Sequence, residues 1–390
     1  MLYQLIITLA LVLFMINLIM NLRRLKKPSL DAKVPDPIPL ISVLVPARNE
    51  ENNIRACLKS LQQQDYPSFE IVVLDDNSTD HTSEIVNAMA ARDSRIRVIR
   101  GQPLPDDWAG KPFACYQLAQ HAIGQYLLFV DADTTHAPHM LRSTLALALE
   151  EKSDMLSGFN HQIADTFPQK VVMPVMNFIL LGWAPLWLLH KSKKPLPSVA
   201  VGQFLLFNRD FYWRMGGHQV VKNRVVEDIW LGIEVAKHGG RHIAVDLSTV
   251  TSCHMYHSVK GMWDGLGKSI YAVIAAMPLG IVAVVAIAAM CYFAPYYFLV
   301  HGLLTGNEPV LSFLLVIAQV GIMLIMRWML DSHYREPGIS MWLHPFGLLF
   351  YLLDVVYTGL RWLNGSPVTW KERSYSKESQ AEESSIPRHN

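Results

Sequence analysis

The chain has 390 residues, of which 51% are hydrophobic and only 17% are charged, and its formal net charge at pH 7 is +1. This length accommodates one large domain or two smaller ones, and the low charged fraction indicates that part of the chain lies in lipid. A nearly neutral chain argues against a nucleic-acid partner, which requires a basic surface. The four cysteines are scattered without a Cys-x-x-Cys pair, so we expect reduced thiols.

Residues 2–22 form an apolar stretch without a charged side chain, long enough to cross a bilayer. Four basic residues follow it: Arg23, Arg24, Lys26 and Lys27. A cleaved signal peptide carries its basic residues before the apolar core, so residues 1–22 are expected to be a retained membrane anchor. The positive-inside rule then places the region that follows in the cytoplasm. Residues 23–39, basic and rich in proline, are expected to form a stiff linker.

From residue 40 onward, short β-branched runs alternate with stretches of helical periodicity. We expect strands at 41–45, 69–74, 96–99 and 126–130, and helices at 50–63, 80–91 and 111–121. This alternation predicts an α/β fold with a mainly parallel sheet, which we assign to residues 40–265. Ligands bind such sheets beyond the carboxyl ends of the strands. The polar residues that follow the strands should therefore converge on one crevice: Arg48, Asn49, Asp75, Asp76, Asp131 and Asp133.

Further apolar segments follow this region. Residues 167–190 are apolar and aromatic but broken by Pro174 and Pro185, so we expect helices at the membrane interface. The basic residues just after them, Lys191, Lys193 and Lys194, suit the lipid headgroup zone. Residues 266–363 contain three apolar stretches, 270–300, 310–330 and 341–362, expected to be transmembrane or interfacial helices.

The side of the C-terminus depends on which of these segments cross the membrane. One anchor and three crossings would place the C-terminus outside, whereas Arg361, Lys371 and Arg373 favour the inside. Either 341–362 lies in the interface or 270–300 is not a simple crossing. We expect residues 364–390 to be a cytoplasmic tail that is disordered from Ser376.

Two carboxylates end the strand expected at 126–130, Asp131 and Asp133. Charges at the end of a buried strand repel each other unless something positive is bound, and a divalent cation carrying a phosphate suits them. An isolated Asp-x-Asp is also common in a solvated turn, so this pair depends on its context.

The context is a set of motifs in a fixed order: residues 45–50, 74–80, 131–133 and 226–228. Together they resemble the motifs of the family-2 inverting glycosyltransferases, over residues 40–265. The resemblance implies a GT-A fold, a nucleotide-diphosphate sugar as donor, most commonly a UDP-sugar, and a divalent metal, Mg²⁺ or Mn²⁺. It also implies inversion of the anomeric centre in one displacement.

The resemblance implies roles for single residues as well. Asp133 would ligate the metal, with Asp131 nearer the ribose or the sugar, and Asp228 would be the general base, with Glu227 beside it. Lys111 lies in a Trp-x-Gly-Lys element that resembles one of membrane glycosyltransferases. The nucleotide would be lined by Pro46, Ala47, Arg48, Asn49, Glu50, Asp75 and Asp76.

Elementary chemistry is consistent with two of these roles. An acceptor hydroxyl is a poor nucleophile near neutral pH, so a carboxylate must take its proton. Asp228 begins a helix expected at 229–237, which favours its ionised form, although ordinary N-terminal capping is the alternative. Lys111 could stabilise the leaving diphosphate, and a solvated lysine is the alternative there.

Three stretches remain open. Processive relatives carry Gln-x-x-Arg-Trp after the general base, but this chain has residues 257–263 instead, which weakens the case for polymer synthesis. His257, Lys260 or Trp263 could take over contacts to the diphosphate and acceptor. The basic and aromatic residues 370–375 could fold back over the nucleotide. Gln203, on a strand expected at 199–207, is either a sugar or acceptor contact or a satisfied core glutamine.

The flanking apolar segments place the crevice next to the bilayer, so a membrane-embedded lipid is the simplest acceptor. The layout is similar to that of the carotenoid glucosyltransferases, which implies glucose and an inner-membrane, multi-pass enzyme; this is analogy at the level of layout. The alternatives are a polyprenyl-phosphate acceptor, a polysaccharide synthase subunit and a non-catalytic scaffold. The complete set of acidic motifs argues against the scaffold.

Overall fold

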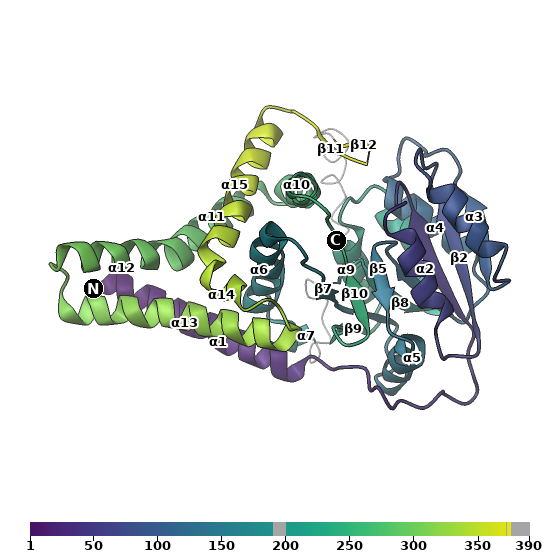
Figure 1. Cartoon of the computed structure of the whole chain (residues 1–390), viewed down its shortest axis with the longest axis horizontal. Helices are drawn as coiled ribbons and strands as arrows, with labels where there is room; N and C mark the ends of the chain where they lie inside the picture. The colour runs from purple at the N-terminus through teal and green to yellow at the C-terminus, as the bar shows by residue number, and fades with distance from the viewer. Residues whose placement is uncertain (190–199, 372, 376–390) are drawn as a thin grey trace, which may run out of the picture.

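The computed structural model describes residues 1–189, 200–371 and 373–375 (Figure 1). The expected headgroup lysines at 191, 193 and 194, and the expected disorder from Ser376, lie outside the described residues. Within the described part, an α/β domain occupies one end of the molecule and long apolar helices occupy the other (Figure 1).

A seven-stranded sheet forms the centre of the α/β domain, in the order β3-β2-β1-β4-β8-β6-β9. Its strands are β1 (Ile41–Ala47), β2 (Phe69–Asp75), β3 (Ile96–Arg100), β4 (Tyr126–Val130), β6 (Met155–Phe159), β8 (Phe204–Asn208) and β9 (His242–Asp246). Every pairing is parallel except those of β8, which runs antiparallel to β4 and β6. The expected α/β fold with a mainly parallel sheet is confirmed.

Helices cover both faces of this sheet, which explains why the strands read as continuous apolar runs. In β1, Val43 and Val45 face a core with α2 (Ile54–Gln62), α3 (Thr82–Ala90) and α5 (Met140–Glu150). Leu44 faces the opposite core, with α4 (Gly110–His121), α8 (Arg209–Arg214) and α9 (Glu227–Lys237). The 3-10 helix η1 (Gly217–Val221) completes that second layer.

The reversed strand β8 brings a turn to the end of β4. Val130 pairs with Phe204, and the amide of Asp131 donates to the Gln203 carbonyl over 3.4 Å. The expected strand at 199–207 is therefore wrong at its start, because β8 begins at Phe204 and Gln203 lies in the preceding turn. This arrangement places Gly202 beside Asp228, whose carboxylate accepts the amide of Gly202.

A small second sheet continues from Asp133, with β5 (Thr134–His136), β10 (Thr251–Cys253) and β7 (His161–Gln162) in that order. Thr134 pairs with Cys253 across β5 and β10. The segment after β10 is thereby held next to Asp133, whose carbonyl accepts the amide of His254 over 2.9 Å.

Four helices among the described residues are long and apolar enough to cross a membrane: Leu2–Arg24, Pro278–Thr305, Val310–Tyr334 and His344–Leu363. They comprise α1 (Leu2–Arg24), α11 (Pro278–Ala288) continued by η2 (Ala289–Phe293) and α12 (Ala294–Thr305), α13 (Val310–Tyr334), and α15 (His344–Leu363). Figure 1 shows α1, α12 and α13 side by side at the end of the molecule farthest from the sheet.

Shorter helices connect this bundle with the α/β domain: α6 (Phe167–Trp183), α7 (Leu186–Leu189), α10 (Val259–Ala276) and α14 (Ile339–Trp342). The expected apolar segment 270–300 is not continuous. Helix α10 ends at Ala276, and Pro278, which lacks an N–H to donate, begins α11. A hairpin of β11 (Val368–Trp370) and β12 (Arg373–Tyr375) then returns the chain to α10.

Candidate active site

A cavity of about 400 Å³ opens at the carboxyl ends of β1, β2 and β4, bounded by α10 and the β11–β12 hairpin. Most of the expected crevice residues line it, from Pro46 to Glu50 together with Asp76, Lys111, Asp131 and Asp133. The opposite wall is formed by the segment after β10, by α10 and by the β11–β12 hairpin. It includes Tyr256, His257, Ser258, Gly261, Gly265, Lys268, Ser269, Trp370, Lys371 and Arg373.

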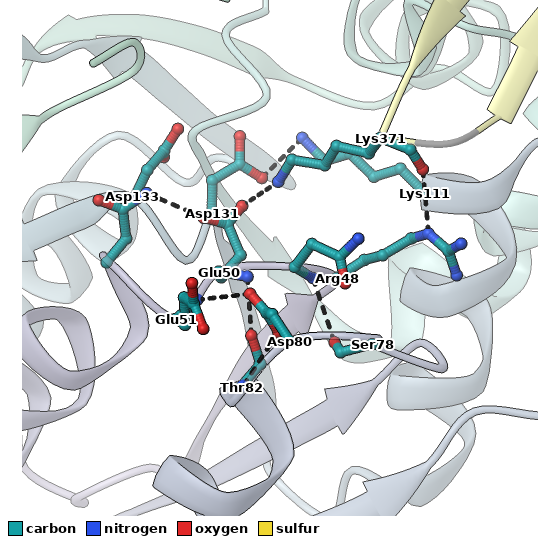
Figure 2. A network of polar contacts seen from close by, with 12 residues as sticks. Arg48, Glu50, Glu51, Ser78, Asp80, Thr82, Lys111, Asp131, Asp133 and Lys371 are labelled. Carbon is teal, nitrogen blue, oxygen red and sulfur yellow. Dashed lines mark hydrogen bonds and ion pairs between the residues drawn. The ribbon is translucent and has the colours of Figure 1, made fainter.

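Two loops form one rim of the cavity and are tied to each other by hydrogen bonds (Figure 2). The Arg48 guanidinium donates to the Asp76 carbonyl over 2.7 Å, and the amide of Asn49 donates to Ser78 Oγ over 3.1 Å. Asn49 takes the left-handed conformation at φ 52°, which asparagine tolerates better than most residues. The amide of Glu50 donates to Thr82 Oγ1 over 2.7 Å. The loop after β1 is thus fixed against the loop after β2.

The end of the cavity next to β2 is marked by a pair between Asp76 and Arg373. The Arg373 guanidinium lies 2.8 Å from Asp76 Oδ2. Burial raises the pKa of Asp76, and the charge of Arg373 offsets this only in part. A Cβ at Gly110 would overlap the Arg373 guanidinium, so the glycine of the Trp-x-Gly-Lys element leaves the space that Arg373 fills.

Lys111, the next residue, joins two carboxylates from different elements. Its ammonium lies 2.7 Å from Asp131 Oδ1 and 3.2 Å from Glu227 Oε1 (Figure 2 shows it directed at Asp131). Burial alone would lower the pKa of Lys111, but the charges of Asp131 and Glu227 raise it well above its ordinary value. Lys111 therefore stays cationic and connects the end of β4 to the start of α9.

Asp228 lies at the second position of α9, behind this pair. Its Oδ2 accepts the amide of Gly202 over 2.8 Å, and its Oδ1 accepts the amide of Ile229 over 2.9 Å. These bonds favour the ionised form, as the helix start predicted, but burial and the charge of Glu227 outweigh them and raise the pKa of Asp228 to about 6. Such a carboxyl is ionised near neutral pH and is a stronger base than an ordinary aspartate.

Asp133 differs from Asp131 in its partners. Its carboxylate accepts from the Cys253 thiol, a weak donor, over 3.5 Å, and no ion pair to it is found among the described residues. Burial and the charges of Asp131 and Glu50 raise the pKa of Asp133 to about 7. A carboxylate crowded by like charges at a cavity wall is suited to a divalent cation.

The residues present fit a metal that is shared with a substrate. The described residues contain no group of three or more His, Cys, Asp or Glu side chains arranged around one metal position. Mg²⁺ and ions like it are commonly bound by one or two carboxylates together with substrate phosphates and water. Asp133 would be the protein ligand in such an arrangement, with oxygens of the substrate completing the set.

Comparison with known proteins agrees with this geometry. Residues 42–216 match the family described as glycosyl transferase family 2. This match covers less than half of the chain. The computed structure also resembles that of the mannosyltransferase PcManGT from Pyrobaculum calidifontis, solved in complex with GDP-Man and Mn²⁺. The TM-score is 0.50 at 19% identity, over 91% of this chain and 98% of that one, and the GT-A fold is confirmed.

Two similar sequences are the 4,4'-diaponeurosporenoate glycosyltransferases of Staphylococcus haemolyticus (strain JCSC1435) and Staphylococcus aureus (strain USA300). They are 30% and 28% identical to this chain over 194 residues, which is 49% of this chain and 50% of each relative. The chain thus spans about half the length of the curated relatives it matches.

Some expected site residues lie outside the cavity wall. Glu227 and Asp228 are among them and stand behind Lys111, which pairs with Glu227. Asp75 is buried and accepts the amide of Ser78 over 3.0 Å, so it shapes the turn after β2. Gln203 is buried, and its Oε1 accepts from Asn160 and Gln162 over 3.0 and 3.1 Å. This is the arrangement of a satisfied core glutamine.

Of the three residues left open in the segment after β10, His257 lines the cavity. Lys260 is exposed in the first turn of α10 and does not line the cavity, and Trp263 packs against Phe350 and Tyr357 instead. Lys268 reaches the cavity from the same helix. Lys268 was not among the residues expected at the site, although it shares a helical face with Gly261 and Gly265 at spacings of seven and three residues.

The C-terminal stretch 370–375 does fold back onto the cavity. Lys371 forms an ion pair with Glu50, and its carbonyl accepts from Arg48 Nε over 3.2 Å (Figure 2). The hairpin thereby closes the side of the cavity that faces the loop after β1.

Proposed function

We propose that the chain is an inverting glycosyltransferase that moves a sugar from a nucleotide-diphosphate sugar to a hydroxyl of a lipid held in the membrane. One observation carries this proposal: the cavity that holds Asp131 and Asp133 is walled by α10, which packs against α15, a helix apolar enough to span a bilayer. A lipid in that bilayer can present its polar end to the cavity while its chain stays in an apolar environment.

The donor would bind at the rim formed by the loops after β1 and β2. Asp76 and Arg48 line this rim and would contact the base and ribose, and Asp133 would hold a divalent metal on the diphosphate. When bound, such a metal stabilises the charge that develops on the leaving diphosphate. Lys111, held cationic by Asp131 and Glu227, adds a second positive charge on the same side of the cavity.

Asp228 would take the acceptor proton. Its two oxygens each accept one amide N–H and retain a further lone pair for an acceptor hydroxyl. As the acceptor oxygen bonds to the anomeric carbon, the bond from that carbon to the diphosphate breaks with its electron pair, and the hydroxyl proton moves to Asp228. Attack opposite the leaving group inverts the anomeric centre.

For the finer assignments we propose glucose as the sugar, UDP as the nucleotide and a carotenoid or similar lipid as the acceptor. The names of the two staphylococcal relatives support a carotenoid as the first class of acceptor to test. The basic residues Arg23 and Arg24 at the end of α1 support an inner-membrane protein whose catalytic domain faces the cytoplasm.

Membranes that contain the full chain provide the test. They are incubated with labelled UDP-glucose, and then with other labelled sugar nucleotides, in Mg²⁺, in Mn²⁺ or in EDTA, and extracted with organic solvent. We expect metal-dependent label in the lipid phase, absent from membranes with the Asp133→Asn variant and present with Asp165→Asn, which alters an exposed acid outside the cavity. If no donor labels the lipid phase of wild-type membranes, the proposal is wrong.

A further inference from the structure

Lys268 differs from three other cations that line the cavity, because no ion pair to its ammonium is found among the described residues. Lys111, Lys371 and Arg373 each form an ion pair, with Asp131, Glu50 and Asp76 respectively. The ammonium of Lys268 has neither an ion pair nor a hydrogen bond among the described residues. It lies over the ring of Trp370, whose centre is 6.0 Å away.

This position is unfavourable for a lone charge. Lys268 is partly buried in the cavity wall, and burial lowers the pKa of its ammonium below the ordinary value. A desolvated charge without a partner costs free energy that a counter-ion recovers. The ammonium of Lys268 is therefore suited to an anionic ligand. The three cations with ion pairs are already neutralised by carboxylates of the protein.

The location of Lys268 indicates which end of the cavity such a ligand would occupy. The charges of Glu227, Lys111 and Asp131, the groups around Asp228, act on its pKa, and so does the charge of Lys371 in the β11–β12 hairpin. Asp76 and Arg373, at the opposite end, are not among the groups that influence it most. Lys268 also belongs to α10, the helix that joins the cavity to the apolar helices, so it lies on the route by which a lipid would enter.

Resting on the sugar transfer proposed above, we propose that Lys268 binds an anionic group of the lipid acceptor, a carboxylate or a phosphate, next to the oxygen that receives the sugar. Lys268 is then a specificity-determining residue that selects acidic lipids over neutral ones of the same chain length. The diphosphate of the donor offers the same chemistry from the other side of the cavity, so the experiment has to separate the two sources.

The test uses the purified full chain in detergent and measures binding, without turnover. One titration follows UDP in the presence of Mn²⁺, and a second follows dodecanoate, dodecyl phosphate and dodecanol. The variants are Lys268→Met, Lys268→Arg and the control Lys260→Met, which removes an exposed lysine of the same helix. Circular dichroism of each variant checks that it is folded.

We expect Lys268→Met to weaken binding of the two anionic amphiphiles by about ten- to a hundredfold, the range of a hydrogen bond to a charged group. Binding of UDP and of dodecanol should not change, Lys268→Arg should retain most of the affinity, and Lys260→Met should behave as wild type. Equal binding of dodecanoate and dodecanol by the wild type would overturn the proposal, as would a loss confined to UDP.

These outcomes are distinguishable from failure of the proposed function. If wild-type protein does not bind UDP or any other nucleotide diphosphate with Mn²⁺, the sugar transfer itself is wrong, whatever Lys268 does. If UDP binds and Lys268→Met binds the anionic amphiphiles as tightly as the wild type does, the proposed role of Lys268 is wrong. The proposed sugar transfer is not affected by that result.

Discussion

The ammonium of Lys111 lies 2.7 Å from a carboxylate oxygen of Asp131, whereas Asp133, two residues further on, has no ion pair among the described residues. The two aspartates of the Asp-x-Asp motif are therefore unequal, since one is neutralised within the protein and the other is available to a metal. This inequality is consistent with the roles expected from the sequence, in which Asp133 binds the metal and Asp131 lies nearer the ribose or the sugar.

The first prediction concerns this inequality. We expect Asp133→Asn to weaken Mn²⁺-dependent binding of UDP by about a hundredfold or more, because even the outer partners of a bound metal are worth about ten- to a hundredfold. Asp131→Asn should cost less than about tenfold, since Lys111 keeps Glu227 as a partner. Calorimetric titration of UDP with and without Mn²⁺ measures both. Equal losses in the two variants would contradict the assignment of Asp133 as the ligand.

The second prediction concerns Asp228. Replacing it with asparagine should lower kcat by about a hundred- to ten-thousandfold, the usual contribution of a general base, and leave UDP binding unchanged. Glu234→Gln, on the same helix but paired with Lys237 away from the cavity, serves as the control. An Asp228→Asn enzyme with substantial activity would indicate that the attacking oxygen is already anionic, as in a polyprenyl phosphate.

A dependence on pH follows from the raised pKa of the same residue. Burial moves the pKa of Asp228 above the usual range of an aspartate, to about 6, and the base acts only when it is ionised. The rate should therefore rise with pH up to about 6 and level off above it. A profile of kcat against pH at saturating metal and donor measures this. A plateau that extends down to about pH 4.5, near the ordinary range of a carboxyl, would exclude Asp228 as the titrating base.

The fourth prediction concerns the turn before β8. A Cβ at Gly202 would lie 3.1 Å from Asp228 Oδ2 and 3.2 Å from the Lys111 ammonium, so one of these side chains has to move. We expect Gly202→Ala to lower kcat by about tenfold or more, since small displacements of catalytic groups are costly, with little change in Tm. Gly338→Ala, where a Cβ meets nothing within 4 Å, should leave kcat and Tm unchanged. Equal activities of the two variants would show that the spacing at residue 202 does not matter.

The sequence predicted the rim of the cavity well because that rim depends on local rules. Apolar runs locate the strands, and in a parallel sheet the residues that follow the strands meet at one edge. Arg48, Asp76 and Asp131 were placed correctly on this basis, without any knowledge of side-chain contacts. The reversed strand β8 was not foreseen, because strand direction depends on pairing between segments distant in the sequence, and periodicity within one segment carries no such information.

The wall that faces the membrane helices was harder to predict. Lys260 and Lys268 belong to the same helix, and only the packing of α10 against α15 and the β11–β12 hairpin decides which lysine faces the cavity. The pairing of Arg373 with Asp76 joins residues almost 300 positions apart and has no local signal beyond the basic and aromatic composition of that stretch. Contacts of this kind follow from tertiary packing.

Transfer of labelled sugar into lipid is the measurement that tests the central claim most directly. Purified protein in nanodiscs made from bacterial lipid extract, given labelled UDP-glucose and Mn²⁺, should produce organic-soluble label. The Asp133→Asn and Asp228→Asn variants should produce none above background, while Asp165→Asn matches the wild type. If the wild type gives no such label with any sugar nucleotide, or if both aspartate variants match it, the cavity described here is not a sugar-transfer site for lipids.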